Sequence, residues 1–131
     1  MNTTRKYSEV KQEYTDKYNQ LIEDAEVFFA FSDEQYEEGA KEGVQYEPFG
    51  MGGFIPVHKV DSFGEATVDL HLWFKEELKK VDLEDIILYE LNNHECFYTG
   101  DWHDTWQALR GLGITQDQIA EVYSKHVRHY A

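Results

Sequence analysis

The sequence predicts an α+β fold: a mainly helical single domain over residues 1–131 with a small two- or three-stranded sheet. Three observations predict this class. Apolar residues recur at helical spacing over most of the chain, two short runs rich in aromatic residues have the composition of strands, and capping sequences stand before several helical runs. With 131 residues, the chain is long enough to bury a core in one domain.

The first elements are expected to be a long helix, a strand and a short helix. Apolar side chains at helical spacing predict an amphipathic helix over 5–25, and the apolar run at 27–31 predicts a buried strand. Residues 32–35, Ser-Asp-Glu-Gln, have the form of a capping box. The short helix that follows is expected to end near Gly39 or Gly43, because glycine is favoured just after the end of a helix.

Residues 50–56, Gly-Met-Gly-Gly-Phe-Ile-Pro, form the one glycine-rich stretch of the chain. The stretch lacks the Gly-Lys-Ser/Thr ending of a Walker phosphate loop, and its glycine spacing differs from that of a dinucleotide-binding turn. We therefore interpret it as a tight, close-packed turn that leads into a short strand.

The C-terminal half is expected to be helical apart from one strand. Alternating residues at 94–98 predict that strand. Asp82 is placed to cap one helix, Thr115 is placed to begin another with a capping box, and Gly64 is expected to make a third irregular. The expected helices span 61–80, 83–91, 102–110 and 116–130.

Charge is the most distinctive feature of the composition. The 26 Asp and Glu residues outnumber the 12 Lys and Arg residues and give a formal net charge of -14. Such a surface repels nucleic acid and anionic membranes, which argues against direct DNA or RNA binding, and it attracts basic partners. These partners include the Lys- and Arg-rich grooves with which other proteins hold nucleic acid. Many soluble proteins are acidic only for solubility, so the charge by itself leaves both interpretations open.

The acidic residues gather in the segment 23–47, where the only cation is Lys41. Several of them would lie on successive turns of the short helix, at a spacing where like charges repel each other. Folding does not require that arrangement, so we expect it to serve binding. The expected partner-binding face consists of Asp33, Glu34, Glu37, Glu38, Glu42 and Glu47.

The remaining composition favours a cytoplasmic location. The single cysteine, Cys96, excludes an internal disulfide and suits a reducing compartment. The N-terminal residues lack the apolar segment of a secretory signal, and no apolar run reaches the length needed to span a bilayer. We therefore expect a soluble, cytoplasmic protein.

The strongest local cluster of His, Cys, Asp and Glu lies at residues 92–104. On the expected strand, His94 and Cys96 would project from the same face, and the following turn would bring Asp101 or His103 over them. Imidazole and thiolate are zinc ligands, so a structural zinc ion would be held by His94, Cys96 and His103. The alternative is a partly buried cysteine and histidine that are satisfied by hydrogen bonds.

The same cluster raises the question of catalysis. Cys96 with His94 or His103 has the composition of a nucleophile and its base. Neighbouring carboxylates raise the pKa of a thiol, however, and no positively charged surroundings are visible in the sequence. We therefore expect no catalytic residues and no enzymatic activity, and keep a small zinc-dependent or thiol-dependent enzyme as the alternative.

Three segments carry a resemblance to a class of known proteins: VFFAFSDEQYEEG at 27–39, GMGGFIP at 50–56 and HECFYTGDW at 94–102. They resemble segments of small proteins from bacteriophages and mobile elements, and the size and acidity are similar to those of anti-CRISPR inhibitors of type II-A Cas9. The resemblance implies a phage protein that acts in the cytoplasm of a bacterial host. Its partner would be a Cas9-type nuclease with its guide RNA, and the acidic face would mimic nucleic acid and block the loading or cleavage of target DNA. Some anti-CRISPR proteins hold a metal structurally, which would agree with zinc at the 94–103 cluster.

Overall fold

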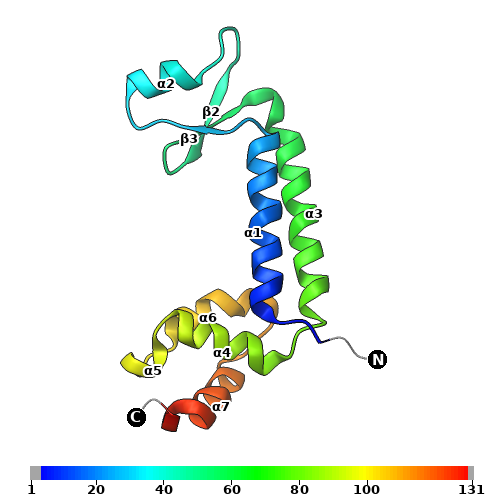
Figure 1. The fold of residues 1–131 in the computed structure, drawn as a ribbon, viewed down its shortest axis with the longest axis vertical. Coiled ribbons are helices and arrows are strands. Elements are labelled where there is room, and N and C mark those ends of the chain that lie inside the picture. The colour runs from blue at the N-terminus through cyan, green and yellow to red at the C-terminus, as the bar shows by residue number, and fades with distance from the viewer. Residues whose placement is uncertain (1–3, 130–131) are drawn as a thin grey trace. The chain divides into compact units, whose positions relative to one another are not determined.

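The computed structural model describes residues 4–129 and confirms the predicted class (Figure 1). The chain is mainly helical (68%), and three strands form one antiparallel sheet. Its internal contacts divide the chain into two compact units. The sheet unit is Gln12–Phe74, and the helical unit combines the described residues before and after it. That the two units together form one domain stays a prediction.

Two long helices, α1 (Tyr7–Asp24) and α3 (Val60–Leu78), supply the helical part of the sheet unit. Their segments within this unit lie side by side (Figure 1), and aromatic rings join them. The ring centroids of Tyr14 and Phe74, for example, are 4.9 Å apart. The tyrosine-rich stripe of α1 is therefore a packing surface, and the predicted helix at 5–25 is confirmed to within two residues at its start.

The helix predicted at 61–80 is confirmed, but the irregularity expected at Gly64 is wrong, because α3 passes through this residue without interruption. A single glycine lowers helix stability by about 1 kcal/mol but fits helical geometry. A Cβ atom at Gly64 would meet open space, so no neighbour forces the backbone to bend there. None of the helices in residues 4–129 has the length and apolarity to cross a membrane.

The sheet contains β1 (Phe28–Phe29), β2 (Tyr46–Gly50) and β3 (Gly53–Pro56), in the order β1-β3-β2. The strands β2 and β3 form a hairpin around Met51 and Gly52, whose φ angles are 50° and 83°. Positive φ at both central residues is typical of the tight turns that join two-residue hairpins. The predicted turn and the strand that follows it are thus confirmed.

The strand predicted at 27–31 is shorter and less buried than expected. Only Phe28 and Phe29 pair with β3, and the two side chains point to opposite faces of the sheet. Phe28 stacks on Phe54 with ring centroids 5.5 Å apart, whereas Phe29 is 51% exposed. The prediction of a buried strand is wrong because β1 lies at the sheet edge and its second face is only partly covered.

The short helix α2 (Asp33–Gly39) begins and ends as predicted. The Ser32 hydroxyl accepts a hydrogen bond from the backbone N–H of Gln35 at 3.2 Å. The Gln35 side chain returns a bond to the backbone N–H of Phe31, one residue before the N-cap, so the predicted capping box is present only in its first half. No residue of α2 is buried, and Tyr36 joins the helix to the sheet through its contact with Phe54, at 4.9 Å between ring centroids.

The helical unit is built from α4 (Leu83–Asn93), α5 (Cys96–Thr99), α6 (His103–Leu109) and α7 (Gln116–His126). Its core includes Ile87, Leu91, Leu109 and Ile119, whose side chains are almost completely buried. Each such side chain contributes about 1.5–3 kcal/mol of burial free energy. The predicted caps are confirmed: Asp82 accepts from the backbone of Glu84, and Thr115 forms both bonds of a capping box with Gln118.

The strand predicted at 94–98 is wrong. Glu95 adopts a left-handed conformation (φ 56°) after the end of α4, and the chain then forms the single helical turn α5. Burial does not alternate, because the adjacent residues Cys96 and Phe97 are both buried. The Phe97 ring stacks on Tyr123 of α7 at 5.3 Å, which holds the turn against the helical core.

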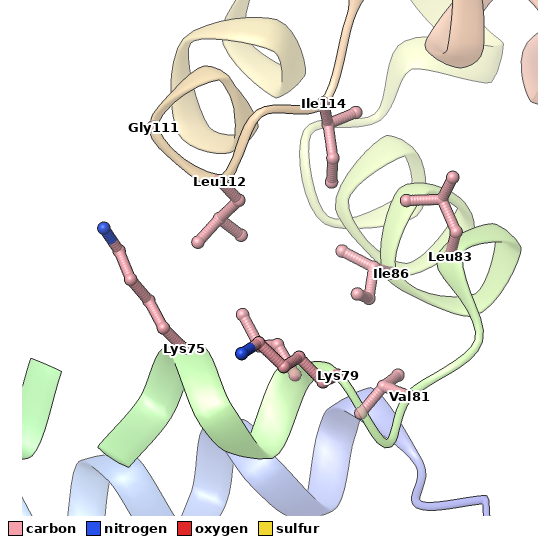
Figure 2. A pocket seen from close by; sticks show the side chains of 9 residues that line it. Lys75, Lys79, Val81, Leu83, Ile86, Gly111, Leu112 and Ile114 are labelled. Carbon is pink, nitrogen blue, oxygen red and sulfur yellow. The ribbon is translucent and has the colours of Figure 1, made fainter. Parts of the chain in front are cut away.

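A groove of about 390 Å³ opens in the helical unit (Figure 2). It lies between the end of α3, the start of α4 and the segment 111–114, which includes part of the 3-10 turn η2 (Arg110–Leu112). Apolar side chains form most of its wall, and Lys75 of α3 and Lys79, just after α3, lie at its edge.

Candidate protein-binding surface

All six carboxylates of the predicted acidic face are exposed on the sheet unit. Four of them lie on α2, Glu42 lies in the turn after α2 and Glu47 lies on β2. Across the described residues, 4–129, none of the six forms an ion pair. We call this set the acidic face: Asp33, Glu34, Glu37, Glu38, Glu42 and Glu47.

The one cation within the acidic segment does not neutralise this face. The Lys41 ammonium pairs with Glu26 at 2.7 Å, and both side chains are largely exposed. The hydrogen bond from Lys41 lowers the pKa of the Glu26 carboxyl, and the positive charge of Lys41 lowers it further. Lys41 therefore compensates a carboxylate outside the acidic face.

An exposed apolar patch lies at the turn of the β2–β3 hairpin, in the same unit. Phe29, Phe31 and Met51 are 51%, 77% and 94% exposed. A Cβ atom at Gly52 would overlap the Phe31 ring, and one at Gly53 would come within 3.0 Å of the Phe29 ring. Both rings thus lie against the hairpin glycines beside Met51. We call these three side chains the apolar patch.

The apolar patch adjoins the acidic face. Phe31 immediately precedes Ser32, the N-cap of α2, and two carboxylates of the face, Asp33 and Glu34, follow in the first turn. An apolar centre bordered by charged groups is the usual composition of a protein-binding surface. Sequence reasoning missed the apolar patch because it treated the whole run 27–31 as buried. The period-2 alternation of strand side chains was the signal that could have separated Phe29 from Phe28.

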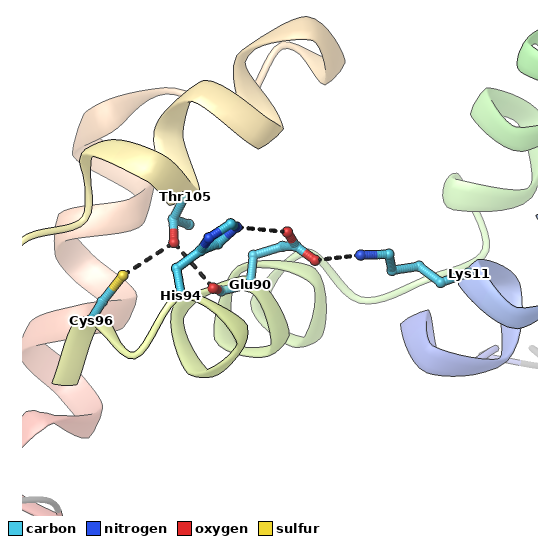
Figure 3. A network of polar contacts seen from close by, with 5 residues as sticks. All are labelled: Lys11, Glu90, His94, Cys96 and Thr105. Carbon is cyan, nitrogen blue, oxygen red and sulfur yellow. Dashed lines mark hydrogen bonds and ion pairs between the residues drawn. The ribbon is translucent and has the colours of Figure 1, made fainter. Parts of the chain in front are cut away.

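The predicted zinc ligands His94, Cys96 and His103 do not converge. Figure 3 shows His94 and Cys96, whose side chains have different partners. His94 follows α4 and its Nε2 lies 3.4 Å from Glu90 Oε2, while Cys96 begins α5 and contacts Thr105. His103 is exposed on α6 and its Nε2 lies 3.0 Å from the side-chain nitrogen of Gln107. Within residues 4–129, no three or more His, Cys, Asp or Glu side chains are placed to hold a metal ion. The expected convergence relied on a strand at 94–98, and α5 takes its place.

Cys96 has the surroundings of a structural thiol. The Thr105 hydroxyl donates to the backbone carbonyl of Glu90 at 3.1 Å, so its oxygen is free to accept from the Cys96 thiol at 3.2 Å. Burial raises the pKa of the thiol, and the negative charges of Asp101 and Asp104 raise it further. A neutral, buried thiol is a poor nucleophile.

A buried carboxylate, Glu90, organises the polar contacts of this region (Figure 3). It receives a charge-assisted hydrogen bond from Lys11 Nζ at 2.8 Å, and the same ammonium lies 5.1 Å from the centroid of the Tyr89 ring. Burial raises the pKa of Tyr7, and the nearby Glu90 carboxylate adds to the increase. The sequence analysis missed this network. The spacing of Glu90 and His94, four residues apart on a helix, was the available signal.

The family comparison covers most of the chain. A model of a family of unknown function, DUF7659, matches residues 10–129. The chain belongs to this family. The match includes the acidic face, the apolar patch, Glu90 and Lys11, whereas Tyr7 lies before it. No curated protein and no solved structure matches the chain.

Proposed function

We propose that this protein is an acidic inhibitor that binds a basic, nucleic-acid-binding surface of a bacterial defence nuclease of the Cas9 type. Binding there would block the loading or the cleavage of target DNA. The observation that carries the proposal is the acidic face itself, which lies beside an exposed apolar patch. Its six carboxylates are exposed, and none of them forms an ion pair with a cation within residues 4–129.

The charge arrangement supports a basic partner. Four carboxylates on one seven-residue helix repel one another, and no described cation relieves that repulsion. A Lys- or Arg-rich partner would relieve it, because each carboxylate can accept charge-assisted hydrogen bonds from ammonium or guanidinium groups. A groove that normally neutralises a phosphate backbone supplies such groups at high density.

The apolar patch supports a protein rather than a small cation as the partner. Long-range attraction between charges speeds association and selects partners of opposite sign, but exposed ion pairs add little affinity. Binding energy at interfaces comes mainly from a few large side chains that become fully buried. Phe31 and Met51 are the most exposed of the patch and would serve as those anchors.

The choice of nuclease is supported by resemblance. The segments that resemble phage and mobile-element proteins include 27–39 and 50–56, and these two segments supply Phe29, Phe31, Met51 and the α2 carboxylates. A Cas9-type nuclease holds its guide–target duplex in a positively charged channel. A rigid acidic surface would compete there with the phosphates of the DNA.

Charge reversal tests the proposal. The triple variant Glu34→Lys, Glu37→Lys, Glu38→Lys is expected to weaken binding to guide-loaded nuclease by at least about a hundredfold, because attraction becomes repulsion at three contacts. Binding is measured by surface plasmon resonance, and the fold is checked by circular dichroism.

A matched control separates the acidic face from net charge. The variant Asp61→Lys, Glu65→Lys, Asp69→Lys changes three exposed carboxylates of α3 in the same unit. Like the α2 variant, it changes one carboxylate in the first turn of a helix. The α3 variant is expected to retain binding within about tenfold, because it weakens only the long-range attraction between the protein's net charge and the basic partner. Equal loss in the two variants would assign the effect to net charge, and unchanged binding in the α2 variant would overturn the proposed face.

A further inference from the structure

The groove of the helical unit has a composition unlike the rest of the molecule. Its wall is formed by apolar side chains from three segments, of which Leu78, Val81, Ile86 and Ile114 are buried and Leu83 and Leu112 are partly exposed. Figure 2 shows Ile86, Leu112 and Ile114 around a common space. Its volume of about 390 Å³ is in the range of small-molecule sites in proteins, about 300–1,000 Å³.

Two lysines provide the charge at this groove. Lys75 lies in the last turn of α3 and Lys79 lies just after its end; both are exposed, and no carboxylate is among the residues that line the groove. Lys79 pairs with Glu76 at 2.8 Å, in an exposed contact that contributes little and is easily exchanged. Lys75 forms no ion pair with any residue in 4–129. In a chain with 26 acidic and 12 basic residues, a groove edged by two lysines and no acid departs from the general charge.

The helix dipole explains part of why lysines occur at this position. Cations near the C-terminal end of a helix are favoured by the helix dipole, and that accounts for Lys75 in the last turn of α3 and for Lys79 just after it. It does not account for the apolar wall opposite them or for the absence of carboxylates from the lining. Apolar surface next to an uncompensated ammonium suits a ligand that has both an apolar body and an anionic group.

We propose that this groove binds a small amphiphile, an apolar chain that ends in a carboxylate. The chain would lie along Leu78, Ile86 and Leu112, and the carboxylate would accept hydrogen bonds from Lys75 and Lys79. This site lies in the helical unit and does not depend on the acidic face, so the two proposals succeed or fail separately.

The proposal requires both an apolar chain and a carboxylate in the ligand. Three probes test the two requirements with the full-length protein: decanoate below its micelle-forming concentration, decanol and acetate. Binding is followed by isothermal titration and by NMR shifts of backbone amides around the groove. Decanoate is expected to bind, with shifts centred on residues 78–86 and 111–114. Decanol, which lacks the charge, and acetate, which lacks the chain, are each expected to bind at least about tenfold more weakly. Equal binding of decanol and decanoate, or shifts elsewhere, would overturn the proposal.

Variants locate the site. The double variant Lys75→Glu, Lys79→Glu is expected to lose at least about tenfold in decanoate affinity, whereas Lys59→Glu, which changes a partly exposed lysine of the sheet unit, leaves it unchanged. Leu112→Trp fills the groove without changing charge and is expected to abolish binding. Circular dichroism verifies that each variant is folded. Undiminished decanoate binding in both the lysine and the Leu112 variants would contradict the assignment.

Discussion

The Thr105 hydroxyl shows how one side chain can connect two segments of the helical unit. It is completely buried, donates to the carbonyl of Glu90 in the last turn of α4 and accepts from the Cys96 thiol at the start of α5. These contacts fix the path of the chain between the two helices, where the sequence predicted a strand. They also occupy the thiol that would otherwise be a candidate metal ligand.

Replacing Thr105 with valine removes the hydroxyl and keeps the shape. Thr105→Val leaves the buried Cys96 thiol without its acceptor and removes one of the two hydrogen bonds to the Glu90 carbonyl, which keeps that from the His94 N–H. The free energy of unfolding is therefore expected to fall by about 1–3 kcal/mol. Urea denaturation measures the change. Thr67→Val is the control, since its hydroxyl bonds to a carbonyl of its own helix in a partly exposed position and is expected to change stability by less than about 1 kcal/mol. Equal changes in the free energy of unfolding for the two substitutions would show that the Thr105 hydrogen bonds stabilise the fold no more than an ordinary side-chain bond within a helix.

The β2–β3 hairpin shows the importance of glycine for the proposed binding surface. Gly52 has φ +83°, and a Cβ atom there would overlap the Phe31 ring. Gly43 has nearly the same backbone conformation, φ +81°, but a Cβ atom there would have no neighbour within 4 Å. The two positions therefore separate the effect of backbone strain from the effect of displacing Phe31.

Both alanine variants are expected to lose about 1–2 kcal/mol of stability, because a left-handed conformation is unfavourable for alanine. Only Gly52→Ala is expected to move the Phe31 ring and so weaken nuclease binding by about tenfold or more. Urea denaturation measures the first effect, and NMR shifts of the Phe31 ring protons together with the binding affinity measure the second. Binding that falls equally in Gly43→Ala would refute a role for Phe31 in positioning the partner.

Elements with a long, regular pattern were predictable from the sequence, and short ones were not. The helices α1, α3, α4 and α7 each carry several turns of apolar periodicity and were placed to within a few residues. The segment 94–98 alternates over only five residues, a pattern that the turn at Glu95 and the packing of Phe97 override. The strand β2 was missed because it contains Pro48, which a strand accepts at a sheet edge.

The candidate site was predictable to the extent that it depends on charge. Consecutive carboxylates such as Glu37 and Glu38 must be exposed in almost any fold, so the acidic face could be named from the sequence. The exposure of Phe31 depends on how its ring meets Gly52, and the burial of Glu90 depends on Lys11, 79 residues away along the chain. Contacts of that kind follow from tertiary structure and leave little trace in local pattern.

At the scale of the whole molecule, the net charge of -14 favours rapid association with any strongly basic surface. Charges more than about 10 Å apart are largely screened at 0.1 M salt, so the long-range part of this attraction depends on ionic strength. The apolar patch contributes binding free energy that salt does not screen. A partner bound through both the acidic face and the apolar patch is expected to lose affinity steeply as salt rises, without losing it completely.

The most direct test of the central claim is a cleavage assay with guide-loaded Cas9-type nuclease and its target DNA, in which this protein is titrated at two salt concentrations. The account predicts inhibition near a one-to-one ratio at low salt and weaker inhibition at high salt, when DNA and nuclease concentrations are kept the same. The triple α2 charge-reversal variant is expected to inhibit at neither concentration. Unimpaired cleavage at both salt concentrations by nucleases from several type II-A systems would contradict the claim.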